Sequence, residues 1–142
     1  MTSEDIIIKQ VTNAIKKAIA KSTFLVQETA KELCAIDTGN LRSSIQADLE
    51  NGIIYTNVDY APNIEYGTVA HTITAKNGLS LAFKWKNAPS GVKTNKDGMV
   101  FLKKIKHPGT KAQPFMRPAL WNNKKRILEI FKEEIQKIWQ QE

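Results

Sequence analysis

The residues whose types and spacing best suggest chemistry are Asp37, Thr38 and Gly39. Asp-Thr-Gly is the tripeptide of aspartic proteases, in which two aspartates share a proton and activate a water molecule. The chain contains one such tripeptide, so a protease of this kind would have to be a homodimer that uses Asp37 from each copy. In these enzymes the tripeptide usually lies in an apolar strand, whereas here a helical pattern precedes Asp37 and Asn40 follows Gly39.

The same segment also fits a joint between a helix and a sheet, and we favour this interpretation. Asp37 is a good N-cap, because its carboxylate can accept a hydrogen bond from a free backbone N–H two or three residues further on. Leu41 and Ile45 lie four residues apart, so a short helical turn would put both on one face. Arg42 would then point elsewhere and be free to meet a carboxylate.

Other catalytic or metal-binding patterns are missing from the sequence. His71 and His107 are the only histidines, and neither has a second ligand at a zinc-like spacing. Cys34 is the only cysteine, which excludes an intrachain disulfide. No glycine-rich phosphate loop is found. We therefore expect no metal site and no cofactor.

Composition predicts one globular domain over residues 1–142. Hydrophobic residues make up 42% of the chain and charged residues 25%, which is typical of a folded, soluble protein rather than a disordered one. No apolar run approaches the roughly 20 residues that a membrane helix needs, and residues 1–9 do not resemble a secretory signal. We therefore expect a cytoplasmic protein without a membrane partner.

The formal net charge of +7 suits a nucleic acid, an anionic surface or an acidic protein as partner. The lysines are spread over the whole chain, however, and the one tight basic block is Lys124, Lys125 and Arg126. A scattered excess of positive charge is typical of a solvated surface, so the charge by itself does not predict a nucleic-acid-reading face.

Two amphipathic patterns predict a long helix at each end of the chain. Apolar side chains recur every three or four residues from Ile8 to Leu33, and again from Leu120 to Trp139. Pro118 suits the first position of the second helix. Between the two patterns, several strand-like runs are interrupted by three hairpin turn signals that favour positive φ. The three signals are Asn51-Gly52, Asn77-Gly78 and Asp97-Gly98.

A short helix is predicted within residues 59–68, with Gly67 ending it in the left-handed conformation. Its Glu65 is a candidate ion-pair partner for Arg42 or Arg117. The predicted fold class is therefore α+β: a long N-terminal helix, an antiparallel meander of hairpins with a short inserted helix, and a C-terminal helix packed on the sheet.

Three segments together resemble the family of putative tail components of tailed phages, the tail-completion or head–tail joining proteins of long-tailed phages and prophages. The first, residues 37–45, reads Asp-Thr-Gly-Asn-Leu-Arg-Ser-Ser-Ile; the second, residues 60–68, reads Tyr-Ala-Pro-Asn-Ile-Glu-Tyr-Gly-Thr. The third, residues 108–119, reads Pro-Gly-Thr-Lys-Ala-Gln-Pro-Phe-Met-Arg-Pro-Ala. Their order and spacing match across nearly the whole chain. One departure is Ile36, where the family often has a Pro-Val or similar pair.

The resemblance implies a virion-assembly protein without enzymatic activity, synthesised in the cytoplasm of the bacterial host. Such proteins form a ring, commonly hexameric, in the neck or at the head-proximal end of the tail. The ring would stack on neighbouring connector and tail-tube proteins and let DNA pass through its lumen without specific binding. The motif residues are then expected to be structural: Asp37, Thr38, Gly39, Leu41, Arg42, Glu65, Gly67, Gln113, Pro114, Phe115, Arg117 and Pro118.

A polar segment with proline and glycine, residues 87–96, predicts a loop. Long loops in compact domains are often ordered by a partner, so on this resemblance we expect it to make the contact between subunits or rings, through Asn87, Pro89, Gly91, Lys93 and Asn95. Two alternatives stay open, a basic nucleic-acid-binding module and, less favoured, a dimeric aspartic protease that uses Asp37.

Overall fold

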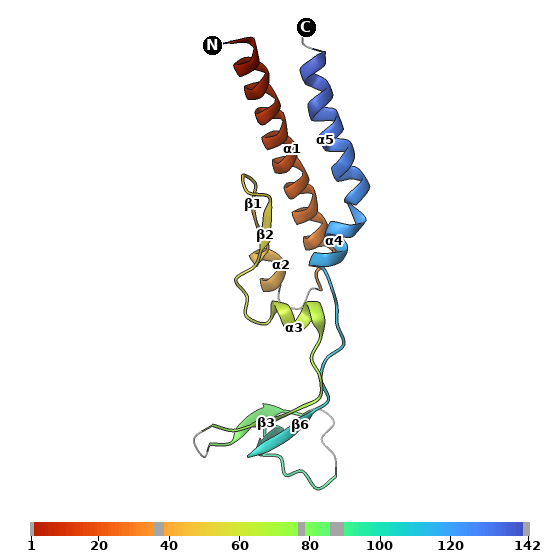
Figure 1. The fold of residues 1–142 in the computed structure, drawn as a ribbon. Helices are drawn as coiled ribbons and strands as arrows, with labels where there is room; N and C mark the ends of the chain where they lie inside the picture. Colours follow the sequence, from red (N-terminus) through yellow and green to blue (C-terminus); the bar gives the residue numbers. More distant parts are fainter. Residues whose placement is uncertain (1, 36–38, 77–78, 86–89, 141–142) are drawn as a thin grey trace. The chain divides into compact units, whose positions relative to one another are not determined.

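The computed structural model describes residues 2–35, 39–76, 79–85 and 90–140. The chain divides into two compact units, which the sequence pattern did not predict. Unit 1 comprises Met1–Tyr66 and Ala112–Glu142, and unit 2 comprises Gly67–Lys111. Figure 1 shows the helices of unit 1 and strands of both units.

Helix α1, Ser3–Leu33, is the longest element of unit 1. It begins with a capping box, in which the Thr2 hydroxyl accepts the N–H of Asp5 at 3.2 Å and the Asp5 carboxylate accepts the N–H of Thr2 at 2.8 Å. Its buried face includes a row of small residues spaced by four: Ala14, Ala18, Ser22, Val26 and Ala30. Such a row lets a second helix approach closely.

The predicted N-terminal helix is therefore confirmed, but part of its expected apolar stripe faces outward. Ile8 is 64% exposed, Ile15 is 39% exposed and Leu33 is 42% exposed. The sequence pattern predicts that the large apolar side chains are buried. In the structure, close packing buries the smaller residue Ala14 instead.

The C-terminal helical pattern forms two helices instead of one, α4 (Met116–Asn122) and α5 (Lys124–Trp139). They are separated at Asn123, whose side-chain amide donates to the carbonyl of Ala119 and to the hydroxyl of Thr29, both at 2.8 Å. Helix α5 packs along α1 (Figure 1). Its Ile127 and Phe131 line one surface hollow together with Ile54 of the neighbouring strand pair.

That strand pair consists of β1 (Gln46–Asp48) and β2 (Ile53–Tyr55), which are antiparallel with Ala47 opposite Ile54. The predicted Asn51-Gly52 turn is confirmed, and Gly52 adopts a φ of +70°. The described part of unit 1 also includes the short helices α2 (Asn40–Ser44), just before β1, and α3 (Ala61–Tyr66), the predicted inserted helix.

The described residues of unit 2 form four short strands: β3 (His71–Thr74), β4 (Leu81–Lys84), β5 (Met99–Leu102) and β6 (Lys104–His107). They form two antiparallel pairs, β3 with β6 and β4 with β5. The α+β class is confirmed, but β3 pairs with β6 and not with its neighbour β4, so the pairing is nested and differs from a simple meander. Alternation of apolar residues fixes the faces of a strand but not its partner. The predicted turn residues Asn77 and Gly78 lie outside the described residues.

The turn predicted at Asp97-Gly98 is present and leads into β5. The side-chain oxygen of Asn95 accepts the N–H of Asp97 at 3.0 Å and of Met99 at 2.8 Å, while Thr94 and Val100 form an antiparallel bridge. The end of the predicted loop, including Asn95, is therefore a hydrogen-bonded hairpin turn. Among the described residues, no helix is long and apolar enough to cross a membrane.

Candidate functional site

Residues from all three motifs meet in one apolar cluster of unit 1. The first motif contributes Leu41 and Ile45, the second Ala61, and the third Phe115 and Ala119. They pack on three residues at the C-terminal end of α1: Val26, Ala30 and Cys34. Phe115 and Ile45 are 1% exposed, so these motif positions are set by packing. Burial raises the pKa of the Cys34 thiol, which favours the unreactive protonated form.

Glu65 joins the second motif to the third. Its carboxylate accepts the backbone N–H of Phe115 at 2.7 Å, of Met116 at 3.0 Å and of Arg117 at 3.2 Å. These groups lie at the start of α4, where the N–H groups have no partner within the helix. Glu65 is 5% exposed and thus acts as a buried N-cap supplied from another helix.

The fourth residue of this first turn is Pro118, which has no N–H to satisfy. Together, Glu65 and Pro118 account for all four free positions at the start of α4. The prediction that Pro118 occupies the first helical position is therefore wrong by two residues. The helix begins earlier because a carboxylate distant in sequence provides the acceptors.

The pKa of Glu65 reflects two opposing effects. Burial raises it, but the hydrogen bonds from the backbone of Phe115 and Met116 and from Arg117 outweigh burial, so the pKa lies below its ordinary value. The carboxylate is therefore ionised at neutral pH. A negative charge at this helix end also interacts favourably with the helix dipole.

Arg117, and not Arg42, is the ion-pair partner of Glu65. Its Nε donates to the Glu65 carboxylate at 2.9 Å, and its Nη2 donates to the Glu65 carbonyl at 3.2 Å. The guanidinium also lies 4.5 Å from the centre of the Tyr66 ring, a cation–π contact. Arg42 is exposed on α2.

A surface groove of about 490 Å³ borders this cluster. Its lining includes Val58, Pro62, Tyr66, Met116 and Arg117. The Tyr66 side chain is 65% exposed. The groove thus presents an exposed aromatic ring in contact with the guanidinium of Arg117.

The other predicted motif residues have local roles. Gly39 precedes α2 with a φ of +80°, a conformation that favours glycine. The N–H of Gln113 donates to the carbonyl of Ile64 at 2.8 Å, and Pro114 is exposed. Asp37 and Thr38 lie outside the described residues, so the predicted cap and the protease alternative stay predictions.

The motifs also contribute to the first residues of unit 2. Thr68 and Thr110 exchange two backbone hydrogen bonds of 3.0 Å, and Gly67 and Gly109 precede them with φ of +72° and +87°. A Cβ on Gly109 would lie 2.2 Å from the carbonyl oxygen of Thr68. Gly109 is therefore required for this close approach of two backbones.

Of the residues predicted to make the assembly contact, Gly91, Lys93 and Asn95 are described and exposed. Asn87 and Pro89 lie outside the described residues. The contact that we predicted for residues 87–96 stays a prediction.

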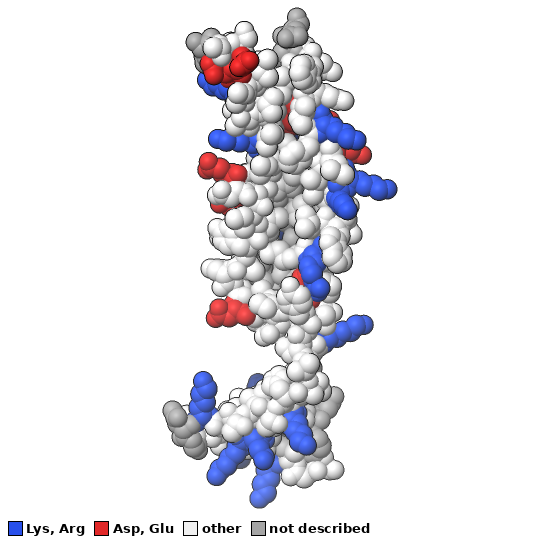
Figure 2. All heavy atoms as spheres, viewed as in Figure 1, with Lys and Arg blue, Asp and Glu red and all other residues white. Residues whose placement is uncertain are grey.

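The charge of the protein is concentrated in unit 2, which sequence reasoning missed. Residues 67–111 contain nine lysines and one acid, Asp97, a net charge of +8, whereas the rest of the chain has a net charge of −1. On the face drawn in Figure 2, unit 2 carries lysine side chains and no visible acidic side chain. The sequence feature that could have revealed this concentration of charge is the scarcity of acidic residues, because Asp97 is the only Asp or Glu between Tyr66 and Leu128.

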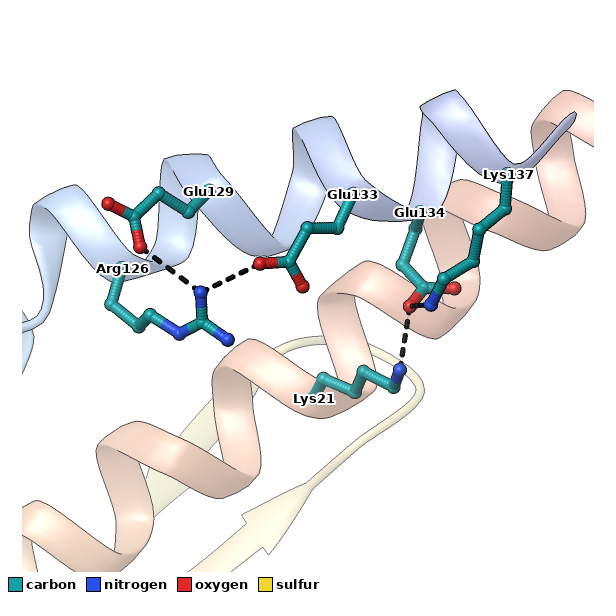
Figure 3. A network of polar contacts seen from close by, with 6 residues as sticks. All are labelled: Lys21, Arg126, Glu129, Glu133, Glu134 and Lys137. Carbon is teal, nitrogen blue, oxygen red and sulfur yellow. Dashed lines mark hydrogen bonds and ion pairs between the residues drawn. The ribbon is translucent and has the colours of Figure 1, made fainter. Parts of the chain in front are cut away.

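Sequence reasoning also missed Glu134, which is 5% exposed on α5. Its Oε1 accepts from the Nζ of Lys137 and from the Nζ of Lys21 on α1, both at 2.6 Å (Figure 3). The hydrogen bonds from Lys137 and then Lys21 lower the pKa of Glu134 to about 2. Figure 3 also shows Arg126 between Glu129 and Glu133 on the exposed side of α5.

Helix α5 carries a second apolar stripe that faces outward. Leu128 is 56% exposed, Ile135 is 38% exposed and Trp139 is 67% exposed. Residues seven and eleven positions apart lie on one face of a helix, so these three side chains form one strip. The sequence pattern did not separate it from the stripe that packs on α1.

In the described part of the chain, no group of three His, Cys, Asp or Glu side chains could hold a metal ion. Comparison with descriptions of known protein families, with curated protein sequences and with solved structures finds no match in any of the three.

Proposed function

We propose that the protein is a structural component of a tailed phage or prophage particle that assembles into a closed ring, with six subunits as the expected number. The resemblance of its three motifs to the tail-completion or head–tail joining family supports this proposal. The ring would lie in the neck or at the head-proximal end of the tail, between connector and tail-tube proteins. The protein would act through shape and not through catalysis.

The observation that carries the proposal is the exposed stripe of Leu128, Ile135 and Trp139 on α5. An apolar strip of this length on a helix whose opposite side is already packed favours contact with another protein surface. We propose that a second copy of the chain covers it. Fully burying a large apolar side chain contributes roughly 1.5–3 kcal/mol. Because these three side chains are 38–67% exposed, covering each of them would contribute about half of that value, which together favours association.

A ring also needs the contact to join two different surfaces. When one patch of a subunit binds a different patch of the next, a closing rotation gives a ring. The groove beside Tyr66 and Arg117 is a second surface of unit 1 that could receive a neighbour. The short strands β1 and β2 form a sheet of two strands in the described residues, and such edges accept further strands.

In this proposal the apolar cluster and Glu65 hold unit 1 in the shape that the neighbour recognises. The segment 87–96 remains our predicted contact with an adjacent ring.

The proposed location is tested in tailed particles. Particles are purified from a bacterial strain that encodes the chain, and an antibody against unit 1 coupled to gold is applied before electron microscopy. We expect label at one end of the tail, and peptides of the chain in a mass spectrum of the same particles. Tailed particles that contain no peptide of the chain would overturn the proposal.

A further inference from the structure

We propose that unit 2 binds the phosphate backbone of duplex DNA, and that the centre of this surface is the face of the β3–β6 pair that carries Lys104 and Lys106. The inference goes beyond ring formation and rests on the residues of unit 2 alone. It assigns a partner to the part of the chain in which the positive charge is concentrated.

The lysines of unit 2 are available for an external partner. All eight that the structure describes are exposed, and none forms an ion pair with an acid in the described part of the chain. They are Lys76, Lys84, Lys93, Lys96, Lys103, Lys104, Lys106 and Lys111. A positive charge that is not neutralised within the protein attracts a polyanion.

The strand register places four donor side chains on one face. Thr72 lies opposite Lys106, and Thr74 lies opposite Lys104. Residues that are directly opposite in an antiparallel pair share a face, and so do residues two positions apart on one strand. All four side chains are exposed. Lysine and threonine are among the residues that donate hydrogen bonds to phosphate oxygens.

The opposite face of the same pair has a different character. It carries His71, Ile73, Ile105 and His107, and the two imidazole rings lie 5.1 Å apart. The donors are therefore separated from the apolar and ring side chains. One face of a two-stranded ribbon is polar and basic, which is the arrangement that a flat contact with a charged backbone requires.

The residue types favour contact with the backbone over reading of bases. Unit 2 contains no arginine, the residue that most often makes specific base contacts in the major groove. Lysine instead offers a compact point charge on a flexible stem. We therefore expect binding without sequence preference and with strong dependence on salt.

Two other classes of partner fit the surface of unit 2 less well than duplex DNA does. Single-stranded nucleic acid is held largely by stacking of successive bases on exposed aromatic rings. In the described part of unit 2, Phe83 and Trp85 pack on each other at 5.8 Å and are only partly exposed, and the remaining Phe or Trp ring, Phe101, is 55% exposed, so a single exposed ring of this kind is offered and not a platform for successive bases. Protein interfaces are enriched in arginine and aromatic residues and depleted in lysine. Unit 2 instead contains nine lysines and no arginine.

The test is a titration of the full chain with a fluorescent DNA duplex of arbitrary sequence at a series of salt concentrations. The fluorescence anisotropy of the duplex measures the binding. The test variant is Lys104→Gln with Lys106→Gln. The matched control is Lys124→Gln with Lys125→Gln, which removes the same charge from two exposed lysines of α5. All proteins also carry Leu128→Gln and Ile135→Gln, so that failure of ring formation does not affect the result.

We expect the test variant to bind about tenfold more weakly at low salt and to reduce the slope of log affinity against log salt by about two. The control should change affinity by less than about twofold. Lys104→Arg with Lys106→Arg keeps the charge and should keep the affinity, which separates loss of charge from loss of folding.

Several results would overturn the proposal. These are no binding of the duplex at low salt, equal weakening by the control pair, or loss of affinity in the arginine variant. Polyglutamate that competes as well as DNA at equal charge concentration would also overturn it, because unit 2 would then bind an acidic protein equally well.

Discussion

At the scale of single residues, the carboxylate of Glu65 stands out because it satisfies three backbone N–H groups and one guanidinium at once. A neutral amide of the same shape can accept only through its oxygen, and its NH₂ would face donors. We expect Glu65→Gln to lower the free energy of unfolding by about 3 kcal/mol, since buried N–H groups would lose a charged acceptor. Denaturant unfolding measures this loss.

The control for Glu65 is Glu129→Gln, which removes a carboxylate from an exposed ion pair on α5. Exposed pairs contribute only about 0–1 kcal/mol. Equal losses in the two variants would show that Glu65 is not the cap on which the start of α4 depends.

Gly109 provides a second prediction at this scale. Gly109→Ala should disrupt the contact between Thr68 and Thr110, because the added Cβ would lie 2.2 Å from the carbonyl oxygen of Thr68. Gly98→Ala is the matched control, since Gly98 also has a positive φ of +73° but no atom within 4 Å of the added Cβ. We expect a cost of about 1 kcal/mol for Gly98→Ala and about 3 kcal/mol or more for Gly109→Ala.

Hydrogen exchange at the amides of Thr68 and Thr110 reports this difference locally. Fast exchange in the Gly109 variant and near-native exchange in the Gly98 variant are expected. If the two variants protect these amides equally, the close approach at Gly109 does not matter for unit 2.

At the scale of elements, Glu134 of α5 joins α1 through an ion pair with Lys21. Its pKa of about 2 is below the ordinary value for a glutamate, so its contribution to stability is complete above about pH 4.5 and is lost as the pH falls through about 2. We expect the melting temperature to fall over this window. In Glu134→Gln the fall should be smaller, because the titrating group has been removed.

Circular dichroism at the helical wavelength follows this melting. Glu129→Gln again serves as the control and should leave the slope with pH unchanged, because its ion pair is exposed. A Glu134→Gln variant that keeps the full acid sensitivity of the native chain would contradict the assignment.

The elements themselves were largely predictable, and their partners were not. The periodicity of α1 and the turn at Asn51-Gly52 are local signals, and both predictions are confirmed. The break at Asn123 is accompanied by a hydrogen bond to Thr29, 94 residues away in sequence, and the pairing of β3 with β6 joins residues 30 or more apart. Such long-range contacts leave no periodic trace in the sequence.

The candidate site was likewise predictable only in part. Glu65 was correctly given Arg117 as one of two candidate partners, because opposite charges were the only signal needed. Its role as the cap of α4 could not be foreseen, since nothing local to Pro118 indicates that an acceptor comes from α3. The exposed stripe of α5 could not be predicted, because the periodicity of apolar residues does not show which of two neighbouring stripes on a helix is buried.

At the scale of the whole molecule, the two units differ in charge and in the surfaces that they offer. Unit 1 has a net charge of −1 and exposes the apolar stripe of α5, whereas unit 2 has a net charge of +8. In our account, unit 1 provides the contacts between subunits of one ring, whereas unit 2 provides the contact with DNA and, through residues 87–96, the predicted contact with an adjacent ring. These different roles follow from the composition of the two units, because exposed apolar surface drives association between proteins and unpaired lysines attract polyanions.

The central claim is that copies of the chain close into a ring through the stripe on α5, and native mass spectrometry over a range of protein concentrations tests it most directly. The account predicts an oligomer of one fixed size, expected to be six, that increases with concentration at the expense of monomer. Leu128→Gln with Ile135→Gln should remain monomeric with an unchanged melting temperature, while the exposed control Lys132→Gln should assemble normally. A native chain that is monomeric at every concentration, or a double variant that assembles as well as the native chain, would contradict the account.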